Sequence, residues 1–171
     1  MKAASFEAIV SALNSAGLSF ILVGGMAVVA HGFGRSTRAV DLVIRLEPQQ
    51  IRQAFAALSA LGYLPRVPIT AEQFADATQR EAWKREKGML VLKFHSDAHR
   101  ETPLDVFVTE PFDFTEEYER AWLSEVASGK FVRVLRLDAL LAMKRAAGRP
   151  QDLADVDELN LLHGQPSSYD T

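Results

Sequence analysis

The stretch from Phe20 to Leu46, FILVGGMAVVAHGFGRSTRAVDLVIRL, carries the pattern that decides the fold. It opens with four apolar residues that meet a pair of glycines, Gly24 and Gly25. A short helical pattern follows, and Val40 to Leu46 then has the composition of a strand that contains one acid, Asp41. The stretch therefore predicts a strand, a tight glycine turn, a short helix and a second strand.

This unit has features that suit a phosphate-bearing ligand. Paired glycines let the backbone turn tightly and bring bare N–H groups close to a ligand. The helix that follows the glycines points its positive N-terminal end the same way, which favours phosphate. An acid on the neighbouring strand favours a metal ion that accompanies the phosphate. We therefore expect the functional site at this turn.

Length and composition predict one ordinary globular domain over residues 1–171. The chain is 48% hydrophobic and 24% charged, and its net charge of -3 gives no global attraction to nucleic acid or to an anionic membrane. No apolar run approaches the roughly 20 residues that span a membrane, and the N-terminus lacks the apolar core of a signal peptide. Cysteine is absent, so a reducing cytoplasm is the expected location, with no membrane partner.

The rest of the chain mixes helical and strand patterns, which predicts an α+β fold. We expect a small mixed β-sheet, helices packed mainly on one face, and a C-terminal helical part at about 137–164. The sequence Thr70 to Gln73 resembles a capping box, and residues 166–171 read as a frayed tail. Helices are expected at 6–13, 26–31, 48–61, from about 71, at 80–87, 112–122, 137–147 and 152–162, and strands or extended segments at 20–23, 40–46, 89–94, 104–108 and 131–135, while residues 62–65 return the chain toward the sheet.

Asp41 is the first candidate for chemistry. On a strand written AVDLVIRL it shares a face with Val43 and Arg45. A carboxylate held this way is costly unless it is paired or binds a metal. The alternative is an edge-strand acid in water, or an ion pair with Arg35 or Arg38.

Asp105 repeats the arrangement in the strand TPLDVFV. Two strands that each carry one acid bring the acids together if the strands are neighbours. Close carboxylates repel, and a divalent cation is the usual remedy, while the alternative for Asp105 is a solvated edge position. We predict that Asp41 and Asp105 lie within reach of one metal ion, close to the Gly24–Gly25 turn.

Two further polar residues, Lys144 and Asp152, each allow two interpretations. Lys144 falls on the apolar stripe of its helix, where it either extends its ammonium group to solvent or reaches an anion at the edge of the core. Asp152 either joins the site or caps the last helix. His31 is expected to be packed or hydrogen-bonded. The basic residues around Trp83 fit a solvated charged helix better than a nucleic-acid surface with tryptophan as a stacking platform.

The motif GGMAVVAHGFGRSTRAVDLVI resembles the signature of nucleotidyltransferases of the DNA polymerase β superfamily, with the AbiEii-like and MNT-like proteins of toxin–antitoxin systems as the most similar group. The likeness extends over residues 21–159. In that family a Gly-Gly turn precedes an Arg-x-Thr-x-Asp-hydrophobic-Asp strand, a third acid lies on a nearby strand, and a Lys…Arg-x-x-Asp pattern closes the chain. The matching positions are Gly24, Gly25, Arg35, Thr37, Asp41, Asp105, Lys144, Arg149, Asp152 and Asp155.

The resemblance implies transfer of a nucleoside monophosphate from an NTP to a hydroxyl of an RNA (tRNA) or protein acceptor, with Mg²⁺ as cofactor. Asp41 and Asp105 would hold the metal, with Asp105 placed to assist deprotonation of the acceptor. A cognate antitoxin is an expected partner. The implied catalytic residues are Asp41, Asp105 and Lys144, and the implied nucleotide-binding residues are Gly24, Gly25, Arg35, Thr37, Lys144 and Asp152.

One position departs from the family pattern. The first acid of the family motif should fall two residues before Asp41, and Ala39 stands there. In the family the paired acids hold two magnesium ions, and alanine supplies no ligand. Whether the alanine is introduced or natural, the sequence predicts a nucleotidyltransferase scaffold with an impaired or inactive metal centre. The alternative function is a non-catalytic protein of this fold that binds a partner protein.

Overall fold

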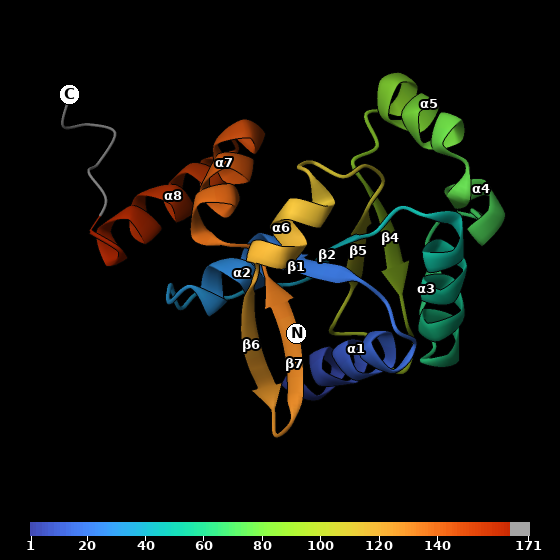
Figure 1. The fold of residues 1–171 in the computed structure, drawn as a ribbon, viewed down its shortest axis with the longest axis horizontal. Helices are drawn as coiled ribbons and strands as arrows, with labels where there is room; N and C mark the ends of the chain where they lie inside the picture. Colours follow the sequence, from blue (N-terminus) through green and yellow to red (C-terminus); the bar gives the residue numbers. More distant parts are fainter. Residues whose placement is uncertain (165–171) are drawn as a thin grey trace.

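The computed structural model describes residues 1–164, and a mixed sheet of seven strands runs through it (Figure 1). The strand order is β3-β4-β5-β2-β1-β7-β6, with β2 parallel to β5, β1 parallel to β7, and the other neighbours antiparallel. The predicted α+β class with a mixed sheet is therefore confirmed. The strands are β1 (Phe20–Val23), β2 (Val40–Ile44), β3 (Leu64–Pro65), β4 (Val91–His95), β5 (Leu104–Phe107), β6 (Trp122–Ala127) and β7 (Lys130–Val134).

Eight helices connect or flank these strands in the described part of the chain. The N-terminal helix and the helix after β2 contact each other, and Phe55 of the latter packs edge-on against Phe94 of β4 with ring centroids 5.4 Å apart. Figure 1 shows the last helix projecting from the body of the molecule. The helices are α1 (Ala3–Ser15), α2 (Gly24–Ala30), α3 (Pro48–Ala60), α4 (Ala71–Ala75), α5 (Ala77–Lys87), α6 (Phe114–Arg120), α7 (Leu137–Ala147) and α8 (Pro150–Leu162).

The two halves of the sheet differ in how they are covered. All four residues of β1 are buried, so the centre of the sheet is covered on both faces. In β4 and β5, by contrast, buried and more exposed positions alternate, so one face of this half packs on the core and the other is open. The open face is the one that carries Lys93 and Asp105, and it borders on Asp41.

Most predicted elements are present, and the capping box of Thr70 and Gln73 forms at the start of α4. The prediction of one helix over 112–122 is wrong at its end, because the helix stops at Arg120 and Trp122 begins the strand β6. β6 pairs with β7 as an antiparallel hairpin at the edge of the sheet. The expected tail at 166–171 lies outside the described residues.

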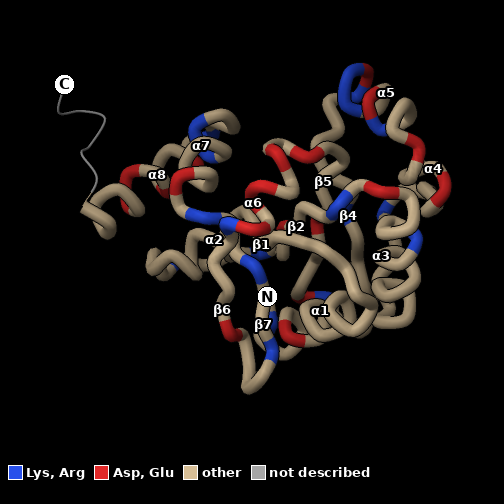
Figure 2. The backbone as a smooth tube through the Cα atoms, in the orientation of Figure 1, with Lys and Arg blue, Asp and Glu red and all other residues tan. Residues whose placement is uncertain are grey.

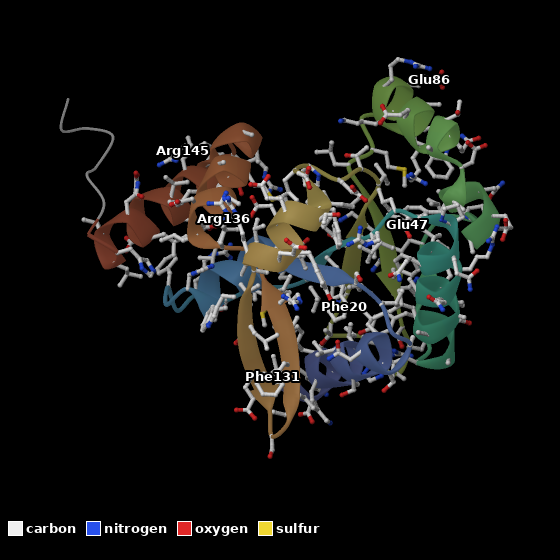
Figure 3. The ribbon with its side chains drawn as sticks, in the orientation of Figure 1. Phe20, Glu47, Glu86, Phe131, Arg136 and Arg145 are labelled. Carbon is white, nitrogen blue, oxygen red and sulfur yellow. The ribbon has the colours of Figure 1, made fainter. Side chains whose placement is uncertain are left out.

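The basic residues around Trp83 lie on a solvated charged helix, as expected. Trp83 is 8% exposed and packs against Phe74, so it offers no stacking surface, while the basic end of α5 is solvated and the labelled Glu86 points outward (Figure 3). On α8, Val156 is buried but Leu153 is 47% exposed, because the buried acids Asp152 and Asp155 occupy part of the inward-facing side of the helix. Among residues 1–164 no helix is both long and apolar enough to cross a membrane.

Candidate nucleotide and metal site

The carboxylate of Asp41 lies directly against the glycine turn. β1 and β2 pair so that Val23 is opposite Asp41, which places the acid beside the first residue of α2. A Cβ atom on Gly24 would overlap the Asp41 carboxylate, with Asp41 Cγ only 2.7 Å away, and Gly24 has a left-handed φ of 66°. Only glycine satisfies both conditions. The turn and the acid therefore form one site, at the N-terminal end of α2.

Asp105 is the direct neighbour of Asp41 on the next strand. β2 and β5 run parallel with these two residues in register, so both side chains point to the same face of the sheet. Burial, together with the nearby charge of Asp105, raises the pKa of Asp41 to about 6, although the charges of Lys144, Lys93 and Arg149 act to lower it. Burial also raises the pKa of Asp105. The geometry thus brings together two carboxylates that repel each other.

Lys93 extends the row of charged residues to a third strand. It lies opposite Asp105 in the antiparallel pairing of β4 with β5, and its Nζ is 3.5 Å from Asp105 Oδ2. The side chain of Lys93 is 62% exposed, whereas that of Asp105 is 13% exposed. A solvated ammonium group therefore stands next to the carboxylate pair.

The loop between α2 and β2 supplies Arg35 and Thr37, which both lie beside the second glycine of the turn. A Cβ on Gly25 would come within 2.7 Å of Thr37 Oγ1 and 3.1 Å of an Arg35 guanidinium nitrogen. The Thr37 hydroxyl donates to the carbonyl of Ala39 at 3.3 Å. Both predicted residues thus flank the turn.

Arg35 is not a free cation, because it is paired with an acid of α8. Its guanidinium Nε and Nη2 groups lie 2.8 Å from the two carboxylate oxygens of Asp155. Gln151 also donates to Asp155, at 3.0 Å. This explains why Arg35 does not form the ion pair with Asp41 that the sequence left open.

Lys144 lies inside the molecule rather than in bulk solvent. Its side chain is 8% exposed, and its Nζ lies 3.1 Å from Asp152 and 3.0 Å from Asp155. Of the two interpretations left open by the sequence, the anion at the edge of the core is therefore the one observed. Its charge also lowers the pKa of Asp41.

Asp152 is a buried network residue at the start of α8. It accepts from Lys144 at 3.1 Å and from the Arg149 guanidinium at 2.6 Å, and it also accepts from the backbone N–H of Arg149 at 3.3 Å. Burial alone would raise the pKa of Asp152, but the hydrogen bonds from Arg149 and Lys144 outweigh it and lower the pKa. Of its two expected roles, the structure shows that Asp152 caps α8.

His31 is hydrogen-bonded, as expected. Its Nε2 lies 2.7 Å from the carbonyl oxygen of Leu135.

Figure 2 shows that the other dense groups of basic residues lie at the two ends of α7 and at the far end of α5. The candidate site therefore combines two acids with the cationic end of α7.

The donor set determines which metal centre fits. Asp41 and Asp105 are the two carboxylates on the site face, and Ala39 presents only a methyl group. Within residues 1–164 no group of three or more His, Asp or Glu side chains is arranged to hold a metal. Mg²⁺ is commonly bound by one or two carboxylates together with substrate phosphates. These residues would fit one magnesium ion shared with a triphosphate, and they do not fit a two-ion centre.

Sequence reasoning assigned no role to Lys93 and Arg149, two cations whose charges act on Asp41. An exposed lysine on an edge-side strand has no sequence signature, so Lys93 emerges only from the register of β4 with β5. Arg149 matches the family pattern but has no role assigned by it, and its charge lowers the pKa of Asp41. In the sequence, the spacing of Lys144 and Asp152 across a break that contains glycine and proline was the pattern that indicated a role for the region around Arg149.

Solved structures provide the comparison. No protein-family model and no curated protein matches the chain. The lincosamide antibiotic adenylyltransferase LnuA with lincomycin bound is similar over 94% of this chain and 97% of its own, with 14% identity and a TM-score of 0.60. The enzyme ANT(2")-Ia in complex with adenylyl-2"-tobramycin is similar over 95% of this chain and 89% of its own, with 14% identity and a TM-score of 0.59.

Both similarities span nearly the whole chain. At 14% identity they establish the architecture. They do not place the chain in the toxin–antitoxin group that the sequence motif resembled. The chain has the fold of the antibiotic nucleotidyltransferases.

Proposed function

We propose that this protein binds an NTP at the Gly24–Gly25 turn and transfers its nucleoside monophosphate to a hydroxyl, with a rate limited by Ala39. The observation that carries this proposal is the position of Asp41, whose carboxylate lies against the glycine turn and beside Asp105. A phosphate chain at the turn would meet backbone N–H groups on one side and carboxylates on the other, which is the setting of a metal–phosphate complex.

The transfer itself needs positioning and charge compensation. The acceptor oxygen attacks the α-phosphorus of the NTP, the bond to the β-phosphate oxygen breaks, and pyrophosphate leaves. Gly24, Gly25 and Thr37 would hold the triphosphate in line, and Asp105 would accept the proton of the acceptor hydroxyl. A bound Mg²⁺, held by Asp41 and Asp105, would supply neutralisation of phosphate charge.

The cationic residues would act indirectly, through the acids with which they are paired. Lys144 is tied to two buried acids, so its role would be to set the field at Asp41 and to fix α7 against α8. Arg35 would hold the turn in shape through Asp155 rather than bind phosphate with a free guanidinium group. Asp152 would anchor Lys144 and Arg149 beside the site.

Several kinds of molecule fit the role of acceptor for the nucleoside monophosphate. The motif resemblance favours a tRNA or a partner protein in the cytoplasm, with a cognate antitoxin encoded nearby. The structural neighbours bring in small molecules, since LnuA is described with lincomycin and ANT(2")-Ia with adenylylated tobramycin. An assay panel of total tRNA, candidate partner proteins, lincomycin and tobramycin with labelled NTPs decides among them.

Calorimetric titration tests the nucleotide site directly. We expect ATP, GTP, CTP or UTP to bind more tightly with Mg²⁺ than without it, because the ion bridges phosphate and carboxylate. Asp105→Asn should remove most of the magnesium dependence. Asp97→Asn, which changes an acid that is 92% exposed, is the matched control and should leave it intact. Absence of magnesium-dependent binding for all four nucleotides would contradict the proposal.

The alternative function, a non-catalytic protein that binds a partner, has one observation in its favour. Ala39 removes a metal ligand from the motif while the fold and the glycine turn remain. This alternative predicts that the chain forms a stable complex with its partner and that Asp105→Asn leaves the complex unchanged. Nucleotide titration distinguishes the two functions, because a pure scaffold shows no magnesium-dependent binding.

A further inference from the structure

Three charged residues form a straight row across neighbouring strands. Lys93 on β4 is in register with Asp105 on β5, and Asp105 is in register with Asp41 on β2. Residues in register share a face, so the row places one ammonium group and two carboxylates side by side on the open side of the sheet. The Lys93 Nζ is already 3.5 Å from Asp105 Oδ2.

The row carries less negative charge than the three-acid motif that the sequence resembles. Ala39 leaves two carboxylates instead of the three that the resembled motif supplies, and Lys93 offsets one of those two. Asp105 is held nearly buried, whereas the Lys93 side chain is 62% exposed. Lys93 can therefore leave the pair when another cation arrives, and Asp105 cannot.

The other cations near the row are paired with other acids or lie farther away. Lys144 is bound to Asp152 and Asp155, and Arg149 is bound to Asp152. Among the described residues, Lys93 is the one cation that contacts a member of the Asp41–Asp105 pair within 4.0 Å.

We propose that Lys93 is the resident counter-cation of the Asp41–Asp105 pair and competes with a divalent metal ion for it. Lys93 stabilises the two acids when no metal is bound, and a metal must displace its ammonium group to bind. The metal affinity of this chain is thus set at position 93 as well as at position 39. This inference rests on the proposed function in that it concerns the same two carboxylates.

Binding of Mn²⁺ alone, followed by electron paramagnetic resonance without nucleotide, tests the competition. Lys93→Gln removes the charge, and we expect it to tighten Mn²⁺ binding about three- to tenfold, because a unit charge no longer repels the ion a few ångströms away. Lys93→Arg keeps the charge and should bind Mn²⁺ like the unchanged chain. Lys84→Gln removes an exposed charge on α5 and should also leave the affinity unchanged.

A second readout separates competition from a structural role. Without metal, Lys93→Gln should lower the melting temperature slightly, because the two acids lose their counter-cation, and saturating Mn²⁺ should raise it by more than in the unchanged chain. Unchanged or weaker Mn²⁺ binding by Lys93→Gln, equal tightening by Lys84→Gln, or no Mn²⁺ binding in any variant overturns the inference. Because no nucleotide is used, tighter Mn²⁺ binding by Lys93→Gln supports the inference even if NTP titration rejects the proposed function.

Discussion

At the residue scale, the site depends on the protonation state of Asp41. Its folded-state pKa of about 6 lies above the ordinary value of 3.8 because the side chain is buried and faces Asp105. When folding raises the pKa of an acid, the folded state becomes less stable as the pH rises, because the unfolded chain loses the proton at a lower pH. The loss begins near pH 4 and is complete above about pH 6. A bound cation would restore the stability that ionisation of Asp41 removes.

Asp41→Asn removes this pH-dependent cost. In the absence of metal we expect the variant to unfold with a free energy about 2–3 kcal/mol higher than the unchanged chain at pH 7–8, and with no advantage at pH 4. Urea denaturation from pH 4 to pH 8 measures the difference, with the exposed Asp97→Asn as control. An advantage of equal size at pH 4 and pH 8 would show that ionisation of Asp41 is not the cause. The same variant should lose magnesium-dependent NTP binding.

Gly24→Ala tests the close approach of the turn to Asp41. Gly88 has a φ of 61° and open space within 4 Å of the position that a Cβ atom would take, so Gly88→Ala carries the backbone strain alone, about 1 kcal/mol. Gly24→Ala has the same strain at a φ of 66° and also forces the Asp41 carboxylate to move, so we expect a loss of about 2–4 kcal/mol. Denaturation and Mg²⁺–NTP titration measure both effects. Equal losses and intact binding in the two variants would place Asp41 away from the turn.

The sequence predicts some residues of the site and not others. Asp41 and Asp105 could be found because an acid within a run of Val, Leu and Phe stands out, and their meeting requires only that two strands be neighbours. Lys93 could not be found, because its partner is fixed by the order of β4, β5 and β2. Nor does the sequence show that Arg35 is paired with Asp155 across 120 positions.

At the element scale, a chain of charged groups fastens the C-terminal helices to the site loop. Arg35 in the loop contacts Asp155 on α8, Asp155 contacts Lys144 on α7, and Lys144 contacts Asp152 on α8. Burial alone would raise the pKa of Asp155, but hydrogen bonds from Arg35, Lys144 and Gln151 lower it. The network therefore positions α7 and α8 over the loop by specific contacts.

Asp155→Ala should be among the most damaging substitutions outside the apolar core. Its carboxylate is fully buried, and its loss leaves the Lys144 ammonium and the Arg35 guanidinium each with one partner fewer. We expect a loss of about 3–5 kcal/mol in the free energy of unfolding. Glu72→Ala breaks the exposed 2.6 Å pair with Arg52 and should cost far less, because solvent screens this pair. Similar losses measured by urea denaturation would show that burial of the network has no energetic consequence.

The elements could be predicted where periodicity is strong. β1 is predicted at its observed bounds and α7 likewise, because apolar runs or stripes end at glycine or proline. β6 was missed because WLSEVA has exposed apolar side chains and no clean alternation, and a preceding acidic helix hides its start. An edge strand buries little, so its sequence is weakly constrained.

At the scale of the whole molecule, one sheet brings together residues that lie far apart in the sequence. β2 at its centre is flanked by β1, which leads into the glycine turn, and by β5, which carries the second acid. The mixed sheet could be predicted from composition and pattern. The strand order could not, because it depends on long-range pairings such as Leu22 with Val134 that no local signal specifies.

We propose that this fold holds a nucleotidyltransferase site that lacks one acid, at position 39. Ala39 lies directly before β2 and two positions before Asp41, so we expect Ala39→Asp to place a third carboxylate near the pair. Loss of one member of a catalytic group commonly costs a factor of up to about 10⁴ in rate, and its return should recover much of that factor. Asp97→Glu, which changes an exposed acid, is the control for altered charge placement elsewhere.

The measurement is the rate of pyrophosphate release from labelled NTPs with Mg²⁺, with water or an added hydroxyl compound as acceptor, by the unchanged chain and by Ala39→Asp. We expect Ala39→Asp to release pyrophosphate about 10²- to 10⁴-fold faster, and Asp105→Asn in the same background to abolish the gain. Equal rates for the unchanged chain and Ala39→Asp, whether both are silent or both active, would contradict the account.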